Sequence, residues 1–293
     1  MTRLMFVATY SPHPRSANPT RAQDSALTLM FDDFLYPRID QTIIYYGPSE
    51  FDFDLLKFYQ QFGINTQHIE LVPDHELIAG IDQHYLDFRP AIRQQLLKLV
   101  ALDRCTDTNI LIQDCDIFAC RPYRWIRDQQ VNLFAIENTQ APHDEWYSYV
   151  NKFTGYSRFD SHCYMNEFLP ITRYDWLALR EHIETKYQRE WLEAMTWQFR
   201  QDMNQGQPLE FSEFELLSAW LLHQGRAMVT AQRRISVPAP LYTAANLSSE
   251  SWFVTQAQKI NPNCVTMANN VRGTEIQAVA NIVRRWIESC HES

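Results

Sequence analysis

The stretch Asn109-Ile110-Leu111-Ile112-Gln113-Asp114-Cys115-Asp116 decides the fold of this chain. Its first five residues form a short apolar run after the polar turn 106–108, which predicts a strand buried in a sheet. The run ends on two aspartates, Asp114 and Asp116. Because open α/β sheets bind ligands outside the carboxyl ends of their strands, we expect a functional site here.

The segments on either side alternate between strand and helix patterns. Leu4–Tyr10 is a continuous apolar run typical of a central parallel strand, and Pro90 begins a helix that reaches about Arg104. This alternation predicts an α/β fold, in which a mostly parallel central sheet is flanked by helices, in one domain of 293 residues. We expect further strands at Gln41–Tyr46, Thr66–Val72 and Val131–Ile136, and further helices at Arg21–Leu35, Phe51–Phe62, Asp175–Trp197, Phe211–Leu222 and Glu275–Cys290.

The composition is that of a folded globular protein and excludes several function classes. The net charge of −9 counts against nucleic-acid binding, and the dinucleotide and P-loop glycine patterns are missing from the sequence. No apolar run approaches the roughly 20 residues that span a bilayer, and the N-terminus lacks a secretory signal, so we expect a cytoplasmic protein. The six scattered cysteines predict reduced, buried thiols rather than disulfides or a zinc site.

Two carboxylates at positions i and i+2, just past a strand, can converge on one divalent cation where the chain turns. Oxygen ligands suit Mg²⁺ or Mn²⁺, and substrate phosphates usually complete such sites. The tripeptide Asp114-Cys115-Asp116 also fits an ordinary strand-end turn with solvated acids. Its setting in the chain therefore decides between the two interpretations.

Four segments together resemble a known family. They are the strand ending at Thr9-Tyr10, the helix Arg93–Cys105 (RQQLLKLVALDRC), the strand Asn109–Tyr123 (NILIQDCDIFACRPY) and the segment Ser212–Leu221 (SEFELLSAWL). This ordered set resembles GT-A-fold glycosyltransferases with a DxD motif, especially a bacterial and phage branch with a similar helix before the motif and an E-F/Y-E-L segment after it. The resemblance implies a GT-A-like domain, with a nucleotide-sugar-binding half over residues 1–125 and an acceptor-side half with C-terminal helices over residues 126–293.

The resemblance also implies roles on the donor side. Asp114 and Asp116 would hold Mn²⁺ or Mg²⁺, with Asp114 also touching the donor, which we expect to be a UDP-sugar. Thr9 and Tyr10 would line the base pocket. Arg93 and Lys98 would face the donor, where their charges can neutralise a diphosphate; the alternative is two solvated charges off the apolar side of their helix.

Candidate residues for the acceptor side come from two further segments. Glu213 or Glu215 could act as the base that deprotonates an acceptor hydroxyl, and Glu215 matches the second acidic position of the family segment. Two residues apart on a helix, only one of them is expected to face a pocket while the other is solvated or caps the helix. His162, in a stretch that shapes the acceptor side in related enzymes, is either such a residue or a structural histidine.

The sequence leaves the acceptor open. By default it is a glycan or surface saccharide, and the same chemistry could act on hydroxymethylated bases in DNA, as in some phage enzymes. A metal-dependent phosphohydrolase using Asp114 and Asp116 is a second enzyme class, although its motif normally lies on the first strand. A non-catalytic saccharide-binding relative is the third alternative. The many aromatic residues between Trp146 and Trp176 are expected to pack a core before they bind a sugar.

Overall fold

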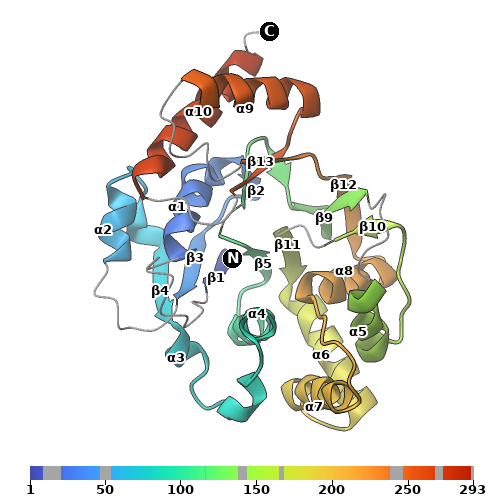
Figure 1. Ribbon diagram of the computed structural model, residues 1–293. Coiled ribbons are helices and arrows are strands. Elements are labelled where there is room, and N and C mark those ends of the chain that lie inside the picture. The colour runs from blue at the N-terminus through green and yellow to red at the C-terminus, as the bar shows by residue number, and fades with distance from the viewer. Residues whose placement is uncertain are drawn as a thin grey trace. The chain divides into compact units, whose positions relative to one another are not determined.

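The computed structural model describes most of the chain (Figure 1). The described residues are 1–8, 21–46, 54–115, 117–137, 144–164, 168–237, 247–267 and 273–291. The chain divides into two compact units, and each is described by itself. The first unit comprises residues 1–2, 75–112 and 126–231, and the second comprises residues 3–74, 113–125 and 232–293. The division into halves at residue 125, within one domain, stays a prediction.

The second unit contains a parallel sheet in the order β1-β3-β4. Met5 of β1 lies opposite Ile43 of β3, and Ile43 lies opposite Glu70 of β4. The apolar run of β1 is buried as its continuity predicts, since Leu4 and Met5 are fully buried. These strands and the helices that follow them have the bounds β1 (Thr2–Ala8), α1 (Arg21–Met30), β3 (Gln41–Tyr46), α2 (Leu55–Gln60) and β4 (Ile69–Pro73).

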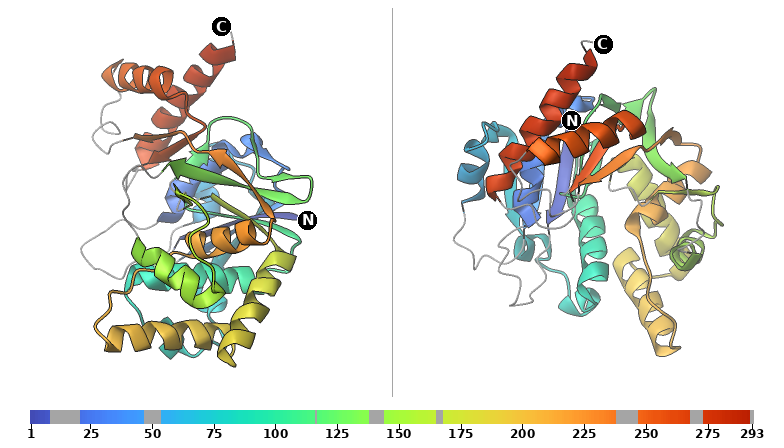
Figure 2. Two further views of the ribbon diagram at one scale, coloured as in Figure 1. Left: turned by 90° about the vertical axis from the view of Figure 1, so that its right-hand side faces the viewer. Right: turned by 45° about the horizontal axis from the view of Figure 1, so that its top comes forward.

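A smaller three-stranded sheet, in the order β13-β14-β6, completes the second unit together with the C-terminal helices. Helix α10 packs against α1 and α9, as the views in Figure 2 also show. The short strands β2 and β7 pair in parallel. The bounds are η1 (Asp32–Phe34), β2 (Leu35–Tyr36), η2 (Thr66–His68), β6 (Ile117–Ala119), β7 (Tyr123–Arg124), β13 (Arg234–Val237), α9 (Leu247–Ile260), β14 (Cys264–Met267) and α10 (Gly273–His291).

The first unit combines a mixed sheet with a group of packed helices. Strand β9 lies between β10, which runs antiparallel to it, and β12, which runs parallel. Helix α8 packs against α5, and α7 packs against α6. The bounds are α3 (Asp74–Leu77), η3 (Gln83–Leu86), α4 (Pro90–Arg104), β5 (Asn109–Gln113), β8 (Ile126–Arg127), β9 (Gln130–Glu137), α5 (Asp144–Thr154), β10 (His162–Cys163), β11 (Phe168–Thr172), α6 (Arg173–Tyr187), α7 (Trp191–Asn204), α8 (Glu213–His223) and β12 (Ala227–Ala231).

The predicted fold class, α/β with a mostly parallel central sheet flanked by helices, is confirmed. The single helix predicted over Asp175–Trp197 is wrong. The chain turns at Gln188, whose φ of 53° is left-handed, and Glu190 then caps a second helix by accepting from the N–H of Leu192. The sequence shows neither Gly nor Pro at this break, so its pattern gave no sign of it.

Aromatic residues fill the core of the first unit, as expected. The rings of Tyr149 and Phe199 pack edge to face with centroids 5.0 Å apart, and the rings of Phe199 and Phe211 lie 5.1 Å apart. Trp176 is fully buried and donates from Nε1 to Oδ1 of Asp103 at 2.9 Å. Among the described residues, no helix is long and apolar enough to cross a bilayer.

Candidate functional site

Asp114 emerges at the end of a completely buried strand. Ile110, Leu111 and Ile112 of β5 are 0% exposed, and Asp114, the first residue after the strand, is partly exposed. Cys115 is buried again, so the partly exposed residue of this turn carries a carboxylate and the buried one a thiol. That donor chemistry fits a hard cation such as Mg²⁺ or Mn²⁺ and not a soft one.

The second aspartate and two donor-side candidates lie outside the described residues. These are Asp116, Thr9 and Tyr10, so their predicted roles stay predictions. Within the described part of the chain, no three His, Cys, Asp or Glu side chains are grouped so that they could hold a metal ion. Asp114 is therefore the described member of the predicted metal pair.

Lys98 and Glu213 form a buried ion pair in the first unit. The Nζ of Lys98 donates to Oε1 of Glu213 at 2.6 Å, and the side chains are 4% and 1% exposed. The ammonium group also lies 4.4 Å from the ring centroid of Phe214. The alternative that Lys98 is a solvated charge is wrong, because its charge is paired inside the protein with a residue 115 positions later.

Glu215 is buried as well, so the expectation that one of the two glutamates is solvated or caps the helix is wrong. Ser212 supplies the cap of α8 through its side chain, which accepts from the N–H of Glu215. Oε1 of Glu215 accepts from the N–H of Tyr164 at 2.8 Å and from Sγ of Cys163 at 3.3 Å. Glu215, in the first turn of α8, therefore holds the backbone at the end of β10 in place.

Tyr147 also lies close to Glu215. Burial, followed by the charge of Glu215, raises the pKa of the Tyr147 hydroxyl, which also donates to the carbonyl oxygen of His162 at 3.2 Å. The guanidinium of Arg158 lies 4.5 Å from the Tyr147 ring centroid and donates to the same carbonyl at 3.2 Å. The phenol thus stays protonated and polar beside a carboxylate.

Asp160 organises the segment that contains His162. Its carboxylate accepts from the Tyr164 hydroxyl at 2.7 Å and from the His162 N–H at 2.8 Å, and Nδ1 of His162 lies 3.1 Å from Oδ2. Burial acts to raise the pKa of Asp160, but these hydrogen bonds outweigh it and the pKa is lowered. His162 is half-buried and belongs to the network that reaches Glu215 through Tyr164.

Arg93 does not share the environment of Lys98, although both lie on α4. It lines a pocket of about 440 Å³ together with Gln83, His84 and Asp87, whereas Lys98 is buried against Glu213. Five residues apart on a helix, the two side chains point in different directions. The structure therefore separates two residues that the resemblance assigns to one ligand.

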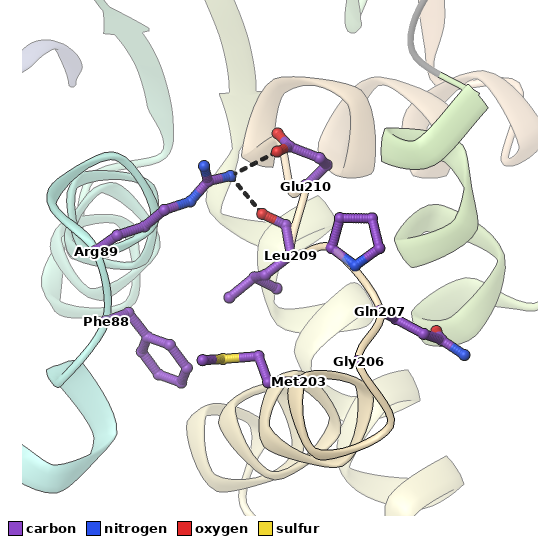
Figure 3. Close-up of a pocket in the computed structure, with 8 residues that line it drawn as sticks. Phe88, Arg89, Met203, Gly206, Gln207, Leu209 and Glu210 are labelled. Atoms are coloured by element: carbon purple, nitrogen blue, oxygen red, sulfur yellow. Dashed lines mark hydrogen bonds and ion pairs between the residues drawn. The ribbon is translucent and has the colours of Figure 1, made fainter.

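A second pocket of the first unit lies beside the chain that enters α8 (Figure 3). Its volume is about 490 Å³. Phe88 and Met203 point toward each other across it, and the side chain of Arg89 reaches Glu210 and the carbonyl oxygen of Leu209. The Arg89–Glu210 ion pair measures 2.9 Å between Nη2 and Oε1. The pocket thus joins an apolar wall to a partly exposed ion pair.

A family model described as "Family of unknown function (DUF6492)" matches residues 27–271, most of the chain. The chain belongs to DUF6492. A comparison of this DUF6492 chain with curated proteins finds no match.

Two solved structures illustrate what the DUF6492 chain is similar to. One is the galactosyltransferase LgtC in complex with donor and acceptor sugar analogs, with a TM-score of 0.49, 11% identity, and coverage of 98% of this chain and 95% of that one. The other is mouse xyloside xylosyltransferase 1, apo form, with a TM-score of 0.44, 8% identity, and coverage of 93% and 99% respectively.

Sequence reasoning on this DUF6492 chain missed the partners of Glu215. Asp160 and Tyr164 lie in the stretch around His162 that the resemblance places on the acceptor side, and Tyr147 is among the aromatic residues weighed for sugar stacking, but their hydrogen bonds were not predicted, although Asp160 stands two residues before His162. An Asp that bonds the N–H two residues on is a recognisable local turn, and that signal could have pointed to a rigid segment. The contact with Glu215 carried no signal, because it joins residues about 50 positions apart.

Proposed function

We propose that the protein is a metal-dependent glycosyltransferase that moves a sugar from a nucleotide-diphosphate sugar, of the UDP type, to a hydroxyl acceptor. The observation that carries this proposal is that Asp114, directly after the buried strand β5, is partly exposed, whereas the neighbouring Cys115 is buried. Support from the sequence comes from Asp116, which completes a two-carboxylate motif. Asp114 and Asp116 would hold Mn²⁺ or Mg²⁺, which when bound offsets negative charge on the leaving diphosphate.

We assign the general base to Glu215 rather than to Glu213. Glu213 is committed to Lys98 at 2.6 Å, so protonating it would leave a buried ammonium without its counter-charge. Glu215 accepts instead from neutral donors, Tyr164 and Cys163. A proton taken up by Glu215 therefore leaves the ion pair of Lys98 and Glu213 intact.

The proposed transfer moves the sugar from the diphosphate oxygen of the donor to the hydroxyl oxygen of the acceptor. The acceptor hydroxyl gives its proton to the Glu215 carboxylate while its oxygen forms a bond to the anomeric carbon of the donor sugar. The bond between that carbon and the diphosphate oxygen breaks, and its electron pair leaves with the nucleoside diphosphate. Tyr147 holds its own proton throughout, because burial and the charge of Glu215 raise the pKa of its hydroxyl.

We assign the acceptor to the pocket of Figure 3. Residues 206–210, which line it, come shortly before α8 in the chain. Phe88 and Met203 offer an apolar wall to the C–H face of a sugar ring. Arg89 and Glu210 offer a donor and an acceptor to its hydroxyl groups. A saccharide is therefore the favoured acceptor class, and His162 belongs to the same unit as this pocket.

The test is a screen of UDP-, GDP- and CMP-sugars for stabilisation of the protein against thermal unfolding, with and without Mn²⁺. A ligand present at a hundred times its dissociation constant adds about 2.7 kcal/mol of stability. Asp114→Asn should abolish the Mn²⁺-dependent stabilisation. Asp33→Asn is the matched control, because it removes another carboxylate of the same unit that is 79% exposed.

Product analysis separates the transferase from its rivals. Glycosyl transfer is supported if the wild type releases nucleoside diphosphate from the donor when an acceptor is added and Glu215→Gln does not. Release of inorganic phosphate instead would indicate a phosphohydrolase. Binding of a saccharide without turnover of any donor, unchanged in Asp114→Asn, would indicate a non-catalytic relative and overturn the proposal.

A further inference from the structure

The side chain of Gln113 bridges the turn that carries Asp114. Gln113 is the last residue of β5, and its Nε2 donates to the carbonyl oxygen of Ile117, the first residue of β6, at 2.5 Å. Thr28 of α1 donates its hydroxyl to the same carbonyl at 2.6 Å. Nε2 of Gln113 also lies 3.3 Å from the Thr28 oxygen. All these residues belong to the second unit.

These contacts form a closed, buried arrangement around one carbonyl group. Gln113 and Ile117 are 0% exposed and Thr28 is 2% exposed. A carbonyl oxygen has two lone pairs, so the donors from Gln113 and Thr28 saturate that of Ile117. Hydrogen bonds thereby connect Gln113, at the start of the turn, to Ile117, at its end, and connect Ile117 to Thr28 of α1. Asp114 is the first residue between Gln113 and Ile117.

Gln113 is an unusual choice for its position. The three residues before it are aliphatic and fully buried, as in a strand covered on both faces. Its Oε1 is buried and has no hydrogen-bond partner within the described residues. Burying that oxygen costs desolvation free energy that an apolar side chain would avoid. Stability alone therefore favours a different residue here. The amide nitrogen is the polar atom of this side chain that makes hydrogen bonds, to the Ile117 carbonyl and to Thr28.

We propose that Gln113, supported by Thr28, is a positioning residue that holds Asp114 ready to bind a divalent cation together with a nucleoside diphosphate. This inference rests on the proposed function. A carboxylate on a turn whose ends are fixed loses little conformational freedom when it binds. Groups that orient a metal ligand without touching the metal typically change metal affinity by about ten- to a hundredfold when they are replaced.

The decisive variant is Gln113→Met, which keeps the length of the side chain and removes the amide. The probe is Mn²⁺, titrated in the presence of saturating UDP or GDP, with unbound Mn²⁺ followed by its electron paramagnetic resonance signal. Gln113→Met should raise the dissociation constant of Mn²⁺ about tenfold or more. Its free energy of unfolding in urea should stay equal to that of the wild type or rise, because the buried Oε1 is removed as well.

Further variants keep the result interpretable. Thr28→Val breaks one of the two bonds to the Ile117 carbonyl at constant volume and should weaken Mn²⁺ binding in the same direction, whereas Thr28→Ser keeps the hydroxyl and should bind normally. If Gln113→Met does not fold, the Thr28 pair decides the question. Gln130→Met is the matched control, because the Gln130 amide also donates to a carbonyl, that of Gly225 at 2.9 Å, but in the first unit.

The outcomes distinguish this inference from the proposed function. If the wild type binds no Mn²⁺ with either nucleotide, the proposed function itself fails, and this inference with it. If the wild type binds Mn²⁺ and Gln113→Met and Thr28→Val bind it within twofold as tightly, the positioning role is overturned while the proposed function stands. Equal weakening in Gln130→Met would also overturn it, since the effect would then be unrelated to the turn.

Discussion

Replacing Glu213 by Gln would leave the ammonium group of Lys98 buried opposite a neutral amide. In the wild type the two charged atoms lie 2.6 Å apart, with side chains 4% and 1% exposed. The Phe214 ring, 4.4 Å from the ammonium, offers it no full counter-charge. The single substitution therefore removes the carboxylate charge that is paired with the buried ammonium.

The size of the effect follows from this geometry. At an effective dielectric constant of about 20, unit charges 2.6 Å apart attract each other by roughly 6 kcal/mol. Part of this attraction only offsets the desolvation of the two groups. Removing one partner of a buried pair costs about 3 to 5 kcal/mol, whereas replacing both by apolar residues is often neutral. We expect Glu213→Gln to fall in the lower part of that range, because the amide still accepts a hydrogen bond.

The assay is urea unfolding of a double-mutant cycle, followed by tryptophan fluorescence. Glu213→Gln and Lys98→Met should each lower the free energy of unfolding by about 3 kcal/mol. The combined Lys98→Met and Glu213→Gln protein should lose clearly less than the sum of the two single losses, because neither charge is then left without the other. The matched control is Glu193→Gln in the exposed i,i+4 pair with Arg189, which should change the free energy by less than about 0.5 kcal/mol.

Two results would refute this reasoning. One is a loss below about 1 kcal/mol for both single variants, which would mean that the pair is solvated. The other is a double variant whose loss equals the sum of the single losses, since independent sites add and paired charges do not.

Three further predictions concern other parts of the chain. Burial, then repulsion by Asp33, raises the pKa of Asp32 from 3.8 to about 6, so the native state binds this proton more tightly and wild-type stability falls as pH rises from about 4 to 6. Asp32→Asn should therefore be more stable than the wild type at pH 7.5, by about 3 kcal/mol at most, and not at pH 4. Equal stability of the two proteins at pH 7.5 in urea unfolding would contradict this. Burial raises the pKa of the Cys120 thiol to about 12, whereas Cys290 is exposed, so iodoacetamide at pH 8 should alkylate Cys290 well before Cys120, as read by peptide mass spectrometry. Met203→Trp should fill the pocket of Figure 3 and raise the acceptor KM about tenfold without changing Mn²⁺-dependent donor binding; an unchanged KM would remove the acceptor from this pocket.

Much of the local structure could be predicted from the sequence. The strands Gln41–Tyr46 and Asn109–Gln113 and the helix Pro90–Arg104 have the bounds that their apolar patterns indicate. Helix α7 extends to Asn204, beyond the predicted helix end at Trp197, and Thr66–His68 forms a 3₁₀ turn before its strand. These errors fall at element ends, where capping and tertiary contacts compete with the local pattern.

The cysteines show the same division between local and tertiary information. Their scattered spacing predicted thiols, and all six are thiols. Cys105, Cys115, Cys120 and Cys264 are buried as expected, but Cys163 is half-buried and Cys290 is exposed. Residue type predicts burial only on average, and the packing around each position decides it.

The sequence by itself determined that Asp114 follows the buried strand β5, because a run of aliphatic residues followed by polar and acidic ones encodes both the strand and its end. Only the tertiary structure decided what Lys98 and Glu213 do, since the pairing of two charges 115 residues apart depends on how α4 and α8 pack. The same holds for the hydrogen bond between Gln113 and Ile117, which depends on the turn between them and on Thr28 of α1. Local patterns encode which elements form, whereas partners for buried polar groups exist only once the chain has folded.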